Sequence, residues 1–418
     1  EAAGIRVDVG YGETLAKELR DRCEALAKEA AGIAAGLGIQ NFKPTEKDRV
    51  AEIVFGKLAF PPGRMTDKRG RPSVEASVLR QFAGQHRFVD AVREHDRYWK
   101  ALSTNVEKYI LPVSRGGWLW PDGKLHSDFH LDVARSGRSS SDNPNIQNIP
   151  VRDRDLAPRI RRMLIPTHPK GEFAELDEKA FELRVSTMYT GDRAFADVFR
   201  RDGNPHAEFA AVLTKKPLTQ VKSGTKDYAA AKGSNFQLIF GGSAFGLRMV
   251  LEQDYGIKLM EAEAFRIVKE FFRLHPETAA YLKESERLVM KQGWVESLTG
   301  RRRAIHPPPE GATGYERNHP FHVAANTRVQ GTAWDLMLGA VLEFYRAMKR
   351  HKLRSRQNNV VHDNGWFDIW PGERAAVLEL AHKAMTQLGH LFDFVTVPLD
   401  TEAKVGPTMG DMVEMPRG

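Results

Sequence analysis

Apolar side chains recur every three or four positions in several long stretches of the chain, which is the spacing of one face of an α-helix. The first stretch runs from Thr14 to about Gly32, and the second from His86 to about Val106. The pattern returns from Phe181 to about Met290, with breaks near three glycines. Two further helices are expected over residues 326–350 and 374–391.

Residues 117–176 lack this spacing and are expected to form short strands and loops. Within FAELDEKAFELRV, a short strand is expected to end at Asp177, with a helix beginning near Phe181. A second β-element is NNVVHDNGWFDI, residues 358–369. Its Asn-Gly pair tolerates the positive φ of a type I′ turn and so predicts a hairpin, with His362 and Asp363 where the chain reverses.

Two aspartates therefore lie at the ends of β-elements, Asp177 after the first strand and Asp363 at the hairpin. If the two elements pair in one sheet, both carboxylates lie at one edge of it, which is the arrangement that a two-metal site requires. Taken singly, each aspartate is equally well explained as a turn or cap residue.

The segment KDYAAAKGSNFQLIFGG predicts a helix with one lysine on an aromatic face. Tyr228, Lys232, Phe236 and Phe240 recur every four residues and therefore share that face. Burying an unpaired ammonium costs several kcal/mol. The pattern thus predicts an anion beside Lys232, such as a phosphate whose base stacks on an aromatic neighbour.

A chain of 418 residues is too long to fold around a single hydrophobic core, so two or three subdomains are expected. Lysine and arginine outnumber aspartate and glutamate by 62 to 54, which favours a polyanionic partner such as nucleic acid. The single cysteine, Cys23, excludes an internal disulfide and fits a reducing compartment. No membrane span or secretory leader is expected, so the cytoplasm or nucleoid is the expected location. The chain opens without methionine, as the middle of a longer protein would.

Together these segments resemble the polymerase module of the DNA polymerase I family, the family A DNA polymerases. The resemblance runs from GIRVD near the start to VPLDTEAKVGPTMGDM near the end. A basic, Pro- and Gly-rich loop is expected to be exposed at residues 60–73. It overlaps the segment TDKRGRPSVEASVL, which resembles the thumb tip of the family. The segment SGRSSSDNPNIQNIPVR resembles the one that holds template and primer. LDEKAFELRV resembles motif A, KGSNFQLIFGGSAFGL motif B and VVHDNGW motif C. GWVESLTGRRR and NTRVQGTAWDLM are also similar to family segments, and the segments occur in the family's order.

The resemblance implies an α+β fold of the right-hand type, with an antiparallel sheet in the palm, a helical thumb and helical fingers. The implied domains are a palm entry at 1–13, a thumb at 14–116, palm at 117–190, fingers at 191–325 and palm at 326–418. The implied activity is template-directed DNA synthesis, in which dNTPs are added to the 3′-OH of a primer and pyrophosphate is released. Primer-template DNA is the implied partner of a monomer located in the cytoplasm, or in the host if the protein is phage-encoded. Whether an exonuclease domain precedes the module is left open.

By position, the resemblance implies that Asp177 and Asp363 hold two Mg²⁺ ions, for which Mn²⁺ can substitute. The backbone carbonyl of Glu178 is a further implied ligand. Lys232 would bind the triphosphate and protonate the pyrophosphate leaving group. Glu182 takes the steric-gate position that excludes a ribose 2′-hydroxyl.

The remaining implied contacts fall into three groups. The nucleotide contacts are His206 at the phosphates, with Phe236 and Phe240 beside the sugar and base. The contacts along the primer terminus and minor groove are Arg138, Asn326, Gln330 and His362. The template contacts are Asn145, Gln147 and Asn148.

Several positions depart from the family's usual residues and indicate a divergent, phage-like branch. Tyr228 replaces an arginine of motif B, and Phe240 replaces a tyrosine whose hydroxyl could anchor Glu182. The other departures are Glu178, Lys179 and Ala180 in motif A, Asn364 in motif C and His322 near the primer strand.

Two alternatives remain open at this point. A single-subunit RNA polymerase of the phage type shares the metal aspartates and the motif B lysine, but Glu182 argues against it because that class leaves room at the gate. A catalytically inactive nucleic-acid clamp on the same fold is the other alternative, and retention of Asp177, Asp363 and Lys232 argues against it.

Overall fold

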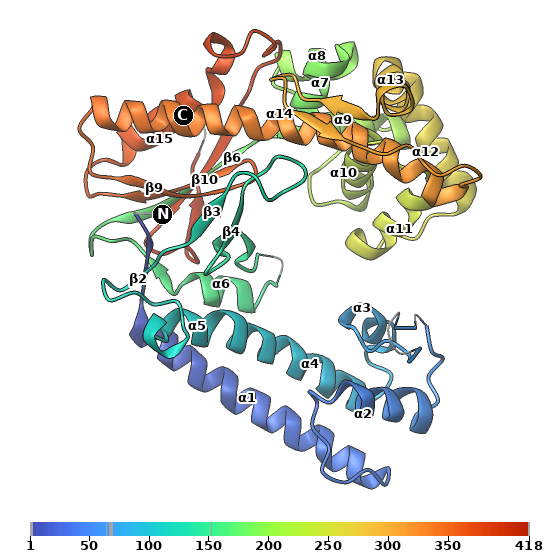
Figure 1. The fold of residues 1–418 in the computed structure, drawn as a ribbon, viewed down its shortest axis with the longest axis vertical. Helices are drawn as coiled ribbons and strands as arrows, with labels where there is room; N and C mark the ends of the chain where they lie inside the picture. The colour runs from blue at the N-terminus through green and yellow to red at the C-terminus, as the bar shows by residue number, and fades with distance from the viewer. Residues whose placement is uncertain (1–2, 64, 67–69, 152, 417–418) are drawn as a thin grey trace. The chain divides into compact units, whose positions relative to one another are not determined.

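The computed structural model describes residues 3–63, 65–66, 70–151 and 153–416 (Figure 1). The chain divides into two compact units. Unit 1 comprises residues 1–128, 143–173 and 406–412, and unit 2 comprises residues 129–142, 174–405 and 413–418. Across the described ranges, no helix combines the length and the apolar character needed to cross a bilayer.

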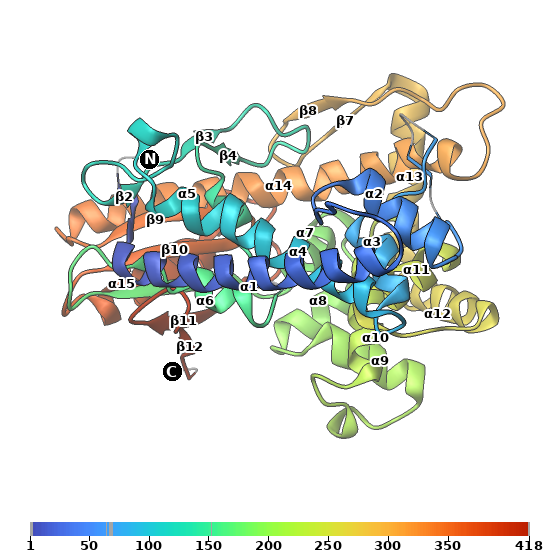
Figure 2. The same cartoon turned by 90° about the horizontal axis from the view of Figure 1, so that it is seen from below.

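Unit 1 is mainly helical. Its two longest helices, α1 and α4, run side by side (Figure 2), and Leu26 and Ala30 of α1 share one buried cluster with Phe88 and Val92 of α4. Its α-helices are α1 (Val9–Gly36), α2 (Lys47–Ala51), α3 (Ala76–Leu79), α4 (Arg87–Ala101), α5 (Glu107–Ile110) and α6 (Leu156–Arg161). A small antiparallel sheet has the order β2 (Lys124–Leu125), β1 (Ile5–Val7), β5 (Leu164–Ile165).

A five-stranded sheet forms the centre of unit 2. Its strand order is β12 (Val413–Glu414), β11 (Thr401–Gly406), β6 (Glu172–Glu178), β10 (Asn364–Ile369), β9 (Arg356–Val361). β9 and β10 form an antiparallel hairpin, as do β11 and β12. Two further strand pairs join β3 (Asp128–His130) to β4 (Ser140–Asp142) and β7 (Trp294–Glu296) to β8 (Arg302–Ala304).

The longest helix, α14 (Gly314–Arg350), lies beside this sheet and packs against α7, α13 and α15 (Figure 1). It carries a stripe of buried residues at helical spacing that includes Ala333, Met337, Ala340 and Phe344. Phe344 meets Phe367 of β10 edge to face, with ring centroids 4.8 Å apart. The other helices of unit 2 are α7 (Phe181–Thr190), α8 (Arg193–Arg200), α9 (Pro205–Thr214), α10 (Lys226–Leu238), α11 (Ala244–Tyr255), α12 (Glu261–Leu274), α13 (Pro276–Gln292) and α15 (Arg374–Thr386).

The helices agree with the predictions in place but not always in length. α1 continues through Gly32 to Gly36, and α14 begins at Gly314 rather than near Asn326. The first turns of α14 are mostly exposed and contain Pro320, so they carry no apolar stripe that could have been recognised. The short helix α6 falls in a region expected to be strands and loops.

The predicted Asn-Gly turn is wrong. Asn364 pairs with Val361 and Gly365 pairs with Val360, so both residues belong to strand β10. The chain reverses through His362 and Asp363, and His362 takes the left-handed conformation with φ of 58°. The pairing of β9 with β10 thus places the chain reversal at His362 and Asp363, directly before the Asn364-Gly365 pair that has the stronger local preference for a turn.

Part of the predicted basic loop at residues 60–73, namely residues 64 and 67–69, lies outside the described residues. The described part of this loop is mostly exposed, as expected.

Candidate active site

The first aspartate is presented by the turn between β6 and α7. Phe173, Ala174 and Leu176 of β6 are buried in the core, and Asp177 follows them half-buried. The strand ends at Glu178, and Ala180 takes a left-handed conformation with φ of 51° before α7 begins. This tight turn directs the chain from sheet to helix within two residues of the strand end.

The second aspartate meets the first, as predicted from the sequence. β6 and β10 are neighbours in the sheet, and the backbone N–H of Glu178 donates to the carbonyl of Asp363 at 3.0 Å. The charge of Asp363 acts directly on Asp177. Two acids far apart in the sequence therefore converge at one place.

The electrostatics of this pair favour a cation. Burial raises the pKa of Asp177 to about 7, and the negative charge of Asp363 adds to the effect. Burial also raises the pKa of Asp363 to about 6, with Glu182 contributing. Two carboxylates in a desolvated setting repel each other, and a divalent cation between them would relieve the repulsion.

Mg²⁺ fits this donor set. In the described part of the chain, no group of three or more His, Cys, Asp or Glu side chains forms a complete metal cage. Mg²⁺ is usually held by one or two carboxylates together with substrate phosphates rather than by an all-protein cage. Asp177 and Asp363 supply such a pair, and backbone carbonyls beside them can complete the protein's share.

The side chain of Glu178 has an environment that the sequence did not reveal. It is 2% exposed, and neither carboxyl oxygen has a hydrogen-bond partner among the described residues. Burial raises its pKa well above the usual range, although the nearby Arg184 guanidinium acts in the opposite direction. The next residue, Lys179, instead forms an ion pair with Asp400 at 2.7 Å.

Glu182, on the first turn of α7, is held by two residues predicted to contact the primer. Arg138 forms an ion pair with it at 2.5 Å, and both side chains are about one-fifth exposed, at 20% and 21%. Gln330 of α14 donates to the same carboxylate oxygen at 3.4 Å. Arg138 and Glu182 line a small pocket together with His362 and the second aspartate, Asp363.

A second cluster forms where α9 packs against α10. The amide of Asn235 donates to Nδ1 of His206 at 3.0 Å and to the carbonyl of Pro205 at 3.3 Å. Burial, together with the positive charge of Lys232, lowers the pKa of His206 to about 3. His206 is therefore neutral, with its proton on Nε2. The ring of Phe236 lies 5.4 Å from the imidazole, centroid to centroid.

Asn235 was not predicted from the sequence, although its side chain orients His206. Its one sequence signal is that it lies three residues after Lys232, a spacing that makes the two side chains neighbours on the surface of α10.

The prediction that Lys232 is buried on an aromatic face is wrong. Lys232 is exposed, and the buried side of α10 is formed by Ala231, Ser234, Asn235 and Leu238. The aromatic residues at this spacing lie on a partly exposed face of α10 rather than in the core. Because the ammonium of Lys232 is not buried, burial gives no argument for an anion beside it. Lys232 nevertheless lies close enough to His206 to affect its pKa.

The other predicted residues are placed as follows. Phe240 lies just past the end of α10 and packs against two core clusters of unit 2. Asn326 is one turn before Gln330 on α14 and is half-buried. The predicted template contacts Asn145, Gln147 and Asn148 belong to unit 1, where the first and last are exposed.

Comparison of the sequence with characterised proteins identifies relatives along nearly its whole length. Thermostable DNA polymerase I of Thermus aquaticus is 32% identical over 413 residues, which cover 97% of this chain and 46% of the relative. DNA polymerase I of Pseudomonas aeruginosa is 29% identical over 408 residues, which cover 97% of this chain and 42% of the relative. The chain thus spans less than half the length of these relatives.

Among solved structures, a POL domain of Pol1 from M. smegmatis, in complex with DNA primer-template and dNTP, has a similar fold. The TM-score is 0.83 at 24% sequence identity, over 98% of this chain and 68% of the other. The predicted α+β fold of the right-hand type is therefore confirmed. The sequence profile of DNA polymerase family A matches residues 10–411, and the chain belongs to this family.

Proposed function

We propose that this chain is a template-directed DNA polymerase module that adds dNTPs to the 3′-OH of a primer and releases pyrophosphate. The observation that carries the proposal is the convergence of Asp177, near the end of β6, with Asp363, in the turn before the neighbouring strand β10. The backbone N–H of Glu178 donates to the carbonyl of Asp363. Membership of DNA polymerase family A supports the same reaction.

Asp177 and Asp363 would hold two Mg²⁺ ions, with the backbone carbonyl of Glu178 as a further ligand and Mn²⁺ as a substitute. When bound, the ions activate the attacking oxygen and neutralise charge on the leaving group. Phosphoryl transfer otherwise needs mainly positioning and charge neutralisation, and the remaining residues of the site supply these.

Residues of α9 and α10 would orient the triphosphate. Lys232 places an exposed ammonium beside His206, and the neutral His206 can donate a hydrogen bond from Nε2 to a phosphate oxygen. Phe236 offers its ring to the sugar and base. Lys232 would also deliver a proton to the departing pyrophosphate.

Glu182 would select the sugar. Its carboxylate is fixed by Arg138 and Gln330, and a fixed carboxylate beside the primer terminus leaves no room for a ribose 2′-hydroxyl. Because Phe240 has no hydroxyl, Arg138 takes over the anchoring role expected of the usual tyrosine.

Primer-template DNA would contact both units. Arg138, Asn326, Gln330 and His362 would read the minor groove, where hydrogen-bond acceptors are nearly the same for every base pair. Asn145, Gln147 and Asn148 would contact the template. The proposed domains are a palm entry at 1–13, thumb 14–116, fingers 191–325 and palm at 117–190 and 326–418, in a monomeric protein of the cytoplasm.

The test is primer extension by an Asp363→Asn variant. Loss of one metal ligand removes several kcal/mol of charge stabilisation, so extension in Mg²⁺ is expected to fall on the order of a thousandfold. Duplex binding without metal is expected to stay close to that of the parent. The matched control is Asp393→Asn at an exposed position of the same unit, and near-normal extension by Asp363→Asn would refute the assignment.

A further inference from the structure

Arg328, on α14, carries a positive charge for which the described part of the chain supplies no acidic partner. Its Nε atom is buried and has no hydrogen-bond partner among the described residues. The charge acts on Glu284, but that carboxylate is already paired with Arg287 at 2.7 Å. A half-buried guanidinium without a counter-charge is costly unless other groups compensate for it.

Two tyrosines and one serine supply this compensation. The guanidinium carbon of Arg328 lies 4.7 Å from the ring centroid of Tyr281 on α13 and 5.0 Å from that of Tyr189 on α7, and both distances are within the range of cation–π attraction. Its Nη1 atom donates to the hydroxyl of Ser285 on α13 at 2.9 Å. Burial raises the pKa of Tyr189 to about 12 and raises that of Tyr281 as well. Both phenols are therefore neutral and attract the cation through their rings.

This cluster lies on one side of the place where α7 packs against α14. Val329 is fully buried in the core cluster that both helices enter. Arg328 precedes Val329 and meets Tyr189 near the end of α7, whereas Gln330 follows Val329 and donates to Glu182 on the first turn of α7. Residues two positions apart on a helix project to nearly opposite sides. The two helices are thus connected on both sides of Val329, which fixes the angle between them.

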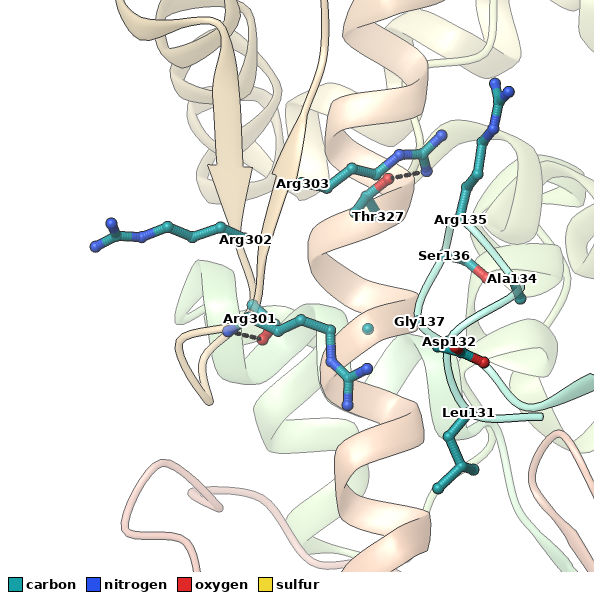
Figure 3. Close-up of a pocket in the computed structure, with 12 residues that line it drawn as sticks. Leu131, Asp132, Ala134, Arg135, Ser136, Gly137, Arg301, Arg302, Arg303 and Thr327 are labelled. Atoms are coloured by element: carbon teal, nitrogen blue, oxygen red, sulfur yellow. Dashed lines mark hydrogen bonds between the residues drawn. The ribbon is translucent and has the colours of Figure 1, made fainter. Parts of the chain in front are cut away.

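α14 is also held by contacts that do not involve the Arg328 side chain. Thr327 accepts a hydrogen bond at 2.6 Å from Arg303 of the β7–β8 hairpin (Figure 3). The hydroxyl oxygens of Thr332 and Tyr189 lie 2.9 Å apart. Removal of the Arg328 charge is therefore expected to change the angle between α7 and α14 without unfolding either helix.

We propose that Arg328 is a positioning residue for sugar selection, because it fixes the angle between α7 and α14 and so holds Gln330 against the carboxylate of Glu182. The inference rests on the proposed function, in which Glu182 excludes a ribose 2′-hydroxyl. Arg328 itself touches neither nucleotide nor DNA in this role. When its charge is removed, α7 can pivot about its packed centre and Gln330 separates from Glu182. The carboxylate then keeps only its ion pair with Arg138.

The test is the ratio of kcat/KM for dNTPs to kcat/KM for NTPs in single-nucleotide primer extension. Arg328→Met keeps a long side chain without the charge and is expected to lower this ratio by about three- to tenfold, the effect of losing one hydrogen bond to a carboxylate. The change is expected as a gain with NTPs. A general defect of folding would instead lower both values and leave their ratio unchanged.

Two further variants of the cluster distinguish a positioning role from a structural one. Arg328→Lys keeps a cation beside the two rings and is expected to restore most of the ratio. Ser285→Ala removes only the hydrogen bond that orients the guanidinium, and it is expected to lower the ratio by about two- to threefold. Because it deletes a single atom, Ser285→Ala also serves as the test should Arg328→Met fail to fold.

A double variant tests the route through Gln330. Gln330→Leu removes the contact through which Arg328 acts, so adding Arg328→Met to it is expected to lower the ratio no further. The matched control is Arg354→Met, which removes another cation from an aromatic ring of unit 2, 3.5 Å from the ring centroid of Trp370. Its ratio is expected to equal that of the parent.

Three results would each overturn the proposal: an unchanged ratio in both Arg328→Met and Ser285→Ala, additive losses in the double variant, or an equal loss in Arg354→Met. Failure of the proposed function has a different signature. A parent protein that extends no primer with either nucleotide type refutes the polymerase assignment and this inference with it. A parent that prefers dNTPs, and keeps that preference when Arg328 is replaced, refutes only this inference.

Discussion

Single side chains in this protein have roles that depend on their neighbours more than on their residue type. Glu182 could be an ordinary helix residue, but Arg138 and Gln330 hold its carboxylate in one position. Lys232 is exposed rather than buried, so its role depends on its closeness to His206. The predictions for single residues therefore depend on the contacts that each side chain makes with its neighbours.

Under the proposed function, sugar selection depends on the carboxylate of Glu182. Replacement by alanine opens the space beside the primer terminus, so Glu182→Ala is expected to lower the preference for dNTPs over NTPs by about ten- to a hundredfold. The measurement is kcat/KM for single-nucleotide extension with each nucleotide type. Glu208→Ala, on α9 and paired with Arg201, is the control, and unchanged discrimination in Glu182→Ala would exclude a gate.

His206 makes the stability of the metal-free protein depend on pH. Its pKa is about 3 in the folded protein and about 6.5 in an unfolded chain. As the pH falls below 6.5, His206 becomes protonated in the unfolded chain but stays neutral in the folded protein, so the free energy of unfolding decreases. The full unfolding free energy is therefore present above pH 6.5. Between pH 7 and pH 5 the neutral His206 lowers it by up to about 2 kcal/mol.

His206→Gln removes this contribution. The drop in unfolding free energy between pH 7 and pH 5, measured in urea, is expected to be smaller in the variant than in the parent by up to about 2 kcal/mol. His306→Gln at an exposed position should follow the parent. Equal drops in all three proteins would mean that His206 takes up a proton in the folded state.

At the scale of elements, the hairpin β9–β10 presents Asp363 at its turn and buries Phe367 further along β10. Gly365 makes this possible, since a Cβ there would lie 2.9 Å from Cζ of Phe367 and 3.2 Å from Nε2 of Gln357. Phe367 is 1% exposed and has little room to move. A glycine expected to form a turn is thus required for strand packing.

Gly365→Ala is expected to destabilise the protein by about 1–3 kcal/mol, because the added methyl group forces a buried ring to shift. The same substitution at Gly32, inside α1 with no atom within 4 Å of the added Cβ, is expected to stabilise by about 0.5–1 kcal/mol. Urea unfolding followed by circular dichroism measures both. A neutral or stabilising Gly365→Ala would show that the hairpin can adjust.

For the whole molecule, the order of motifs along the chain was sufficient to predict the family and the fold class. Asp177 and Asp363 could be placed at the ends of β-elements in advance because strand-to-turn patterns are local and readable from residue spacing, whereas Glu182 was singled out only by its position in the segment that resembles motif A. The pairing of β6 and β10 in one sheet, which the sequence left as a condition, is met in the structure. The contact of Asn235 with His206, by contrast, joins side chains of two different helices, and no local pattern predicts it.

The sequence by itself determined which segments are helical, which acids end β-elements and to which family the chain belongs, since these follow from spacing and residue type. Only the tertiary structure decided that Asn364 and Gly365 belong to a strand, which face of α10 is buried and how Asn235 orients His206. These features depend on burial and on contacts between distant segments. Both arise when the chain is packed, and packing can override a local preference by several kcal/mol.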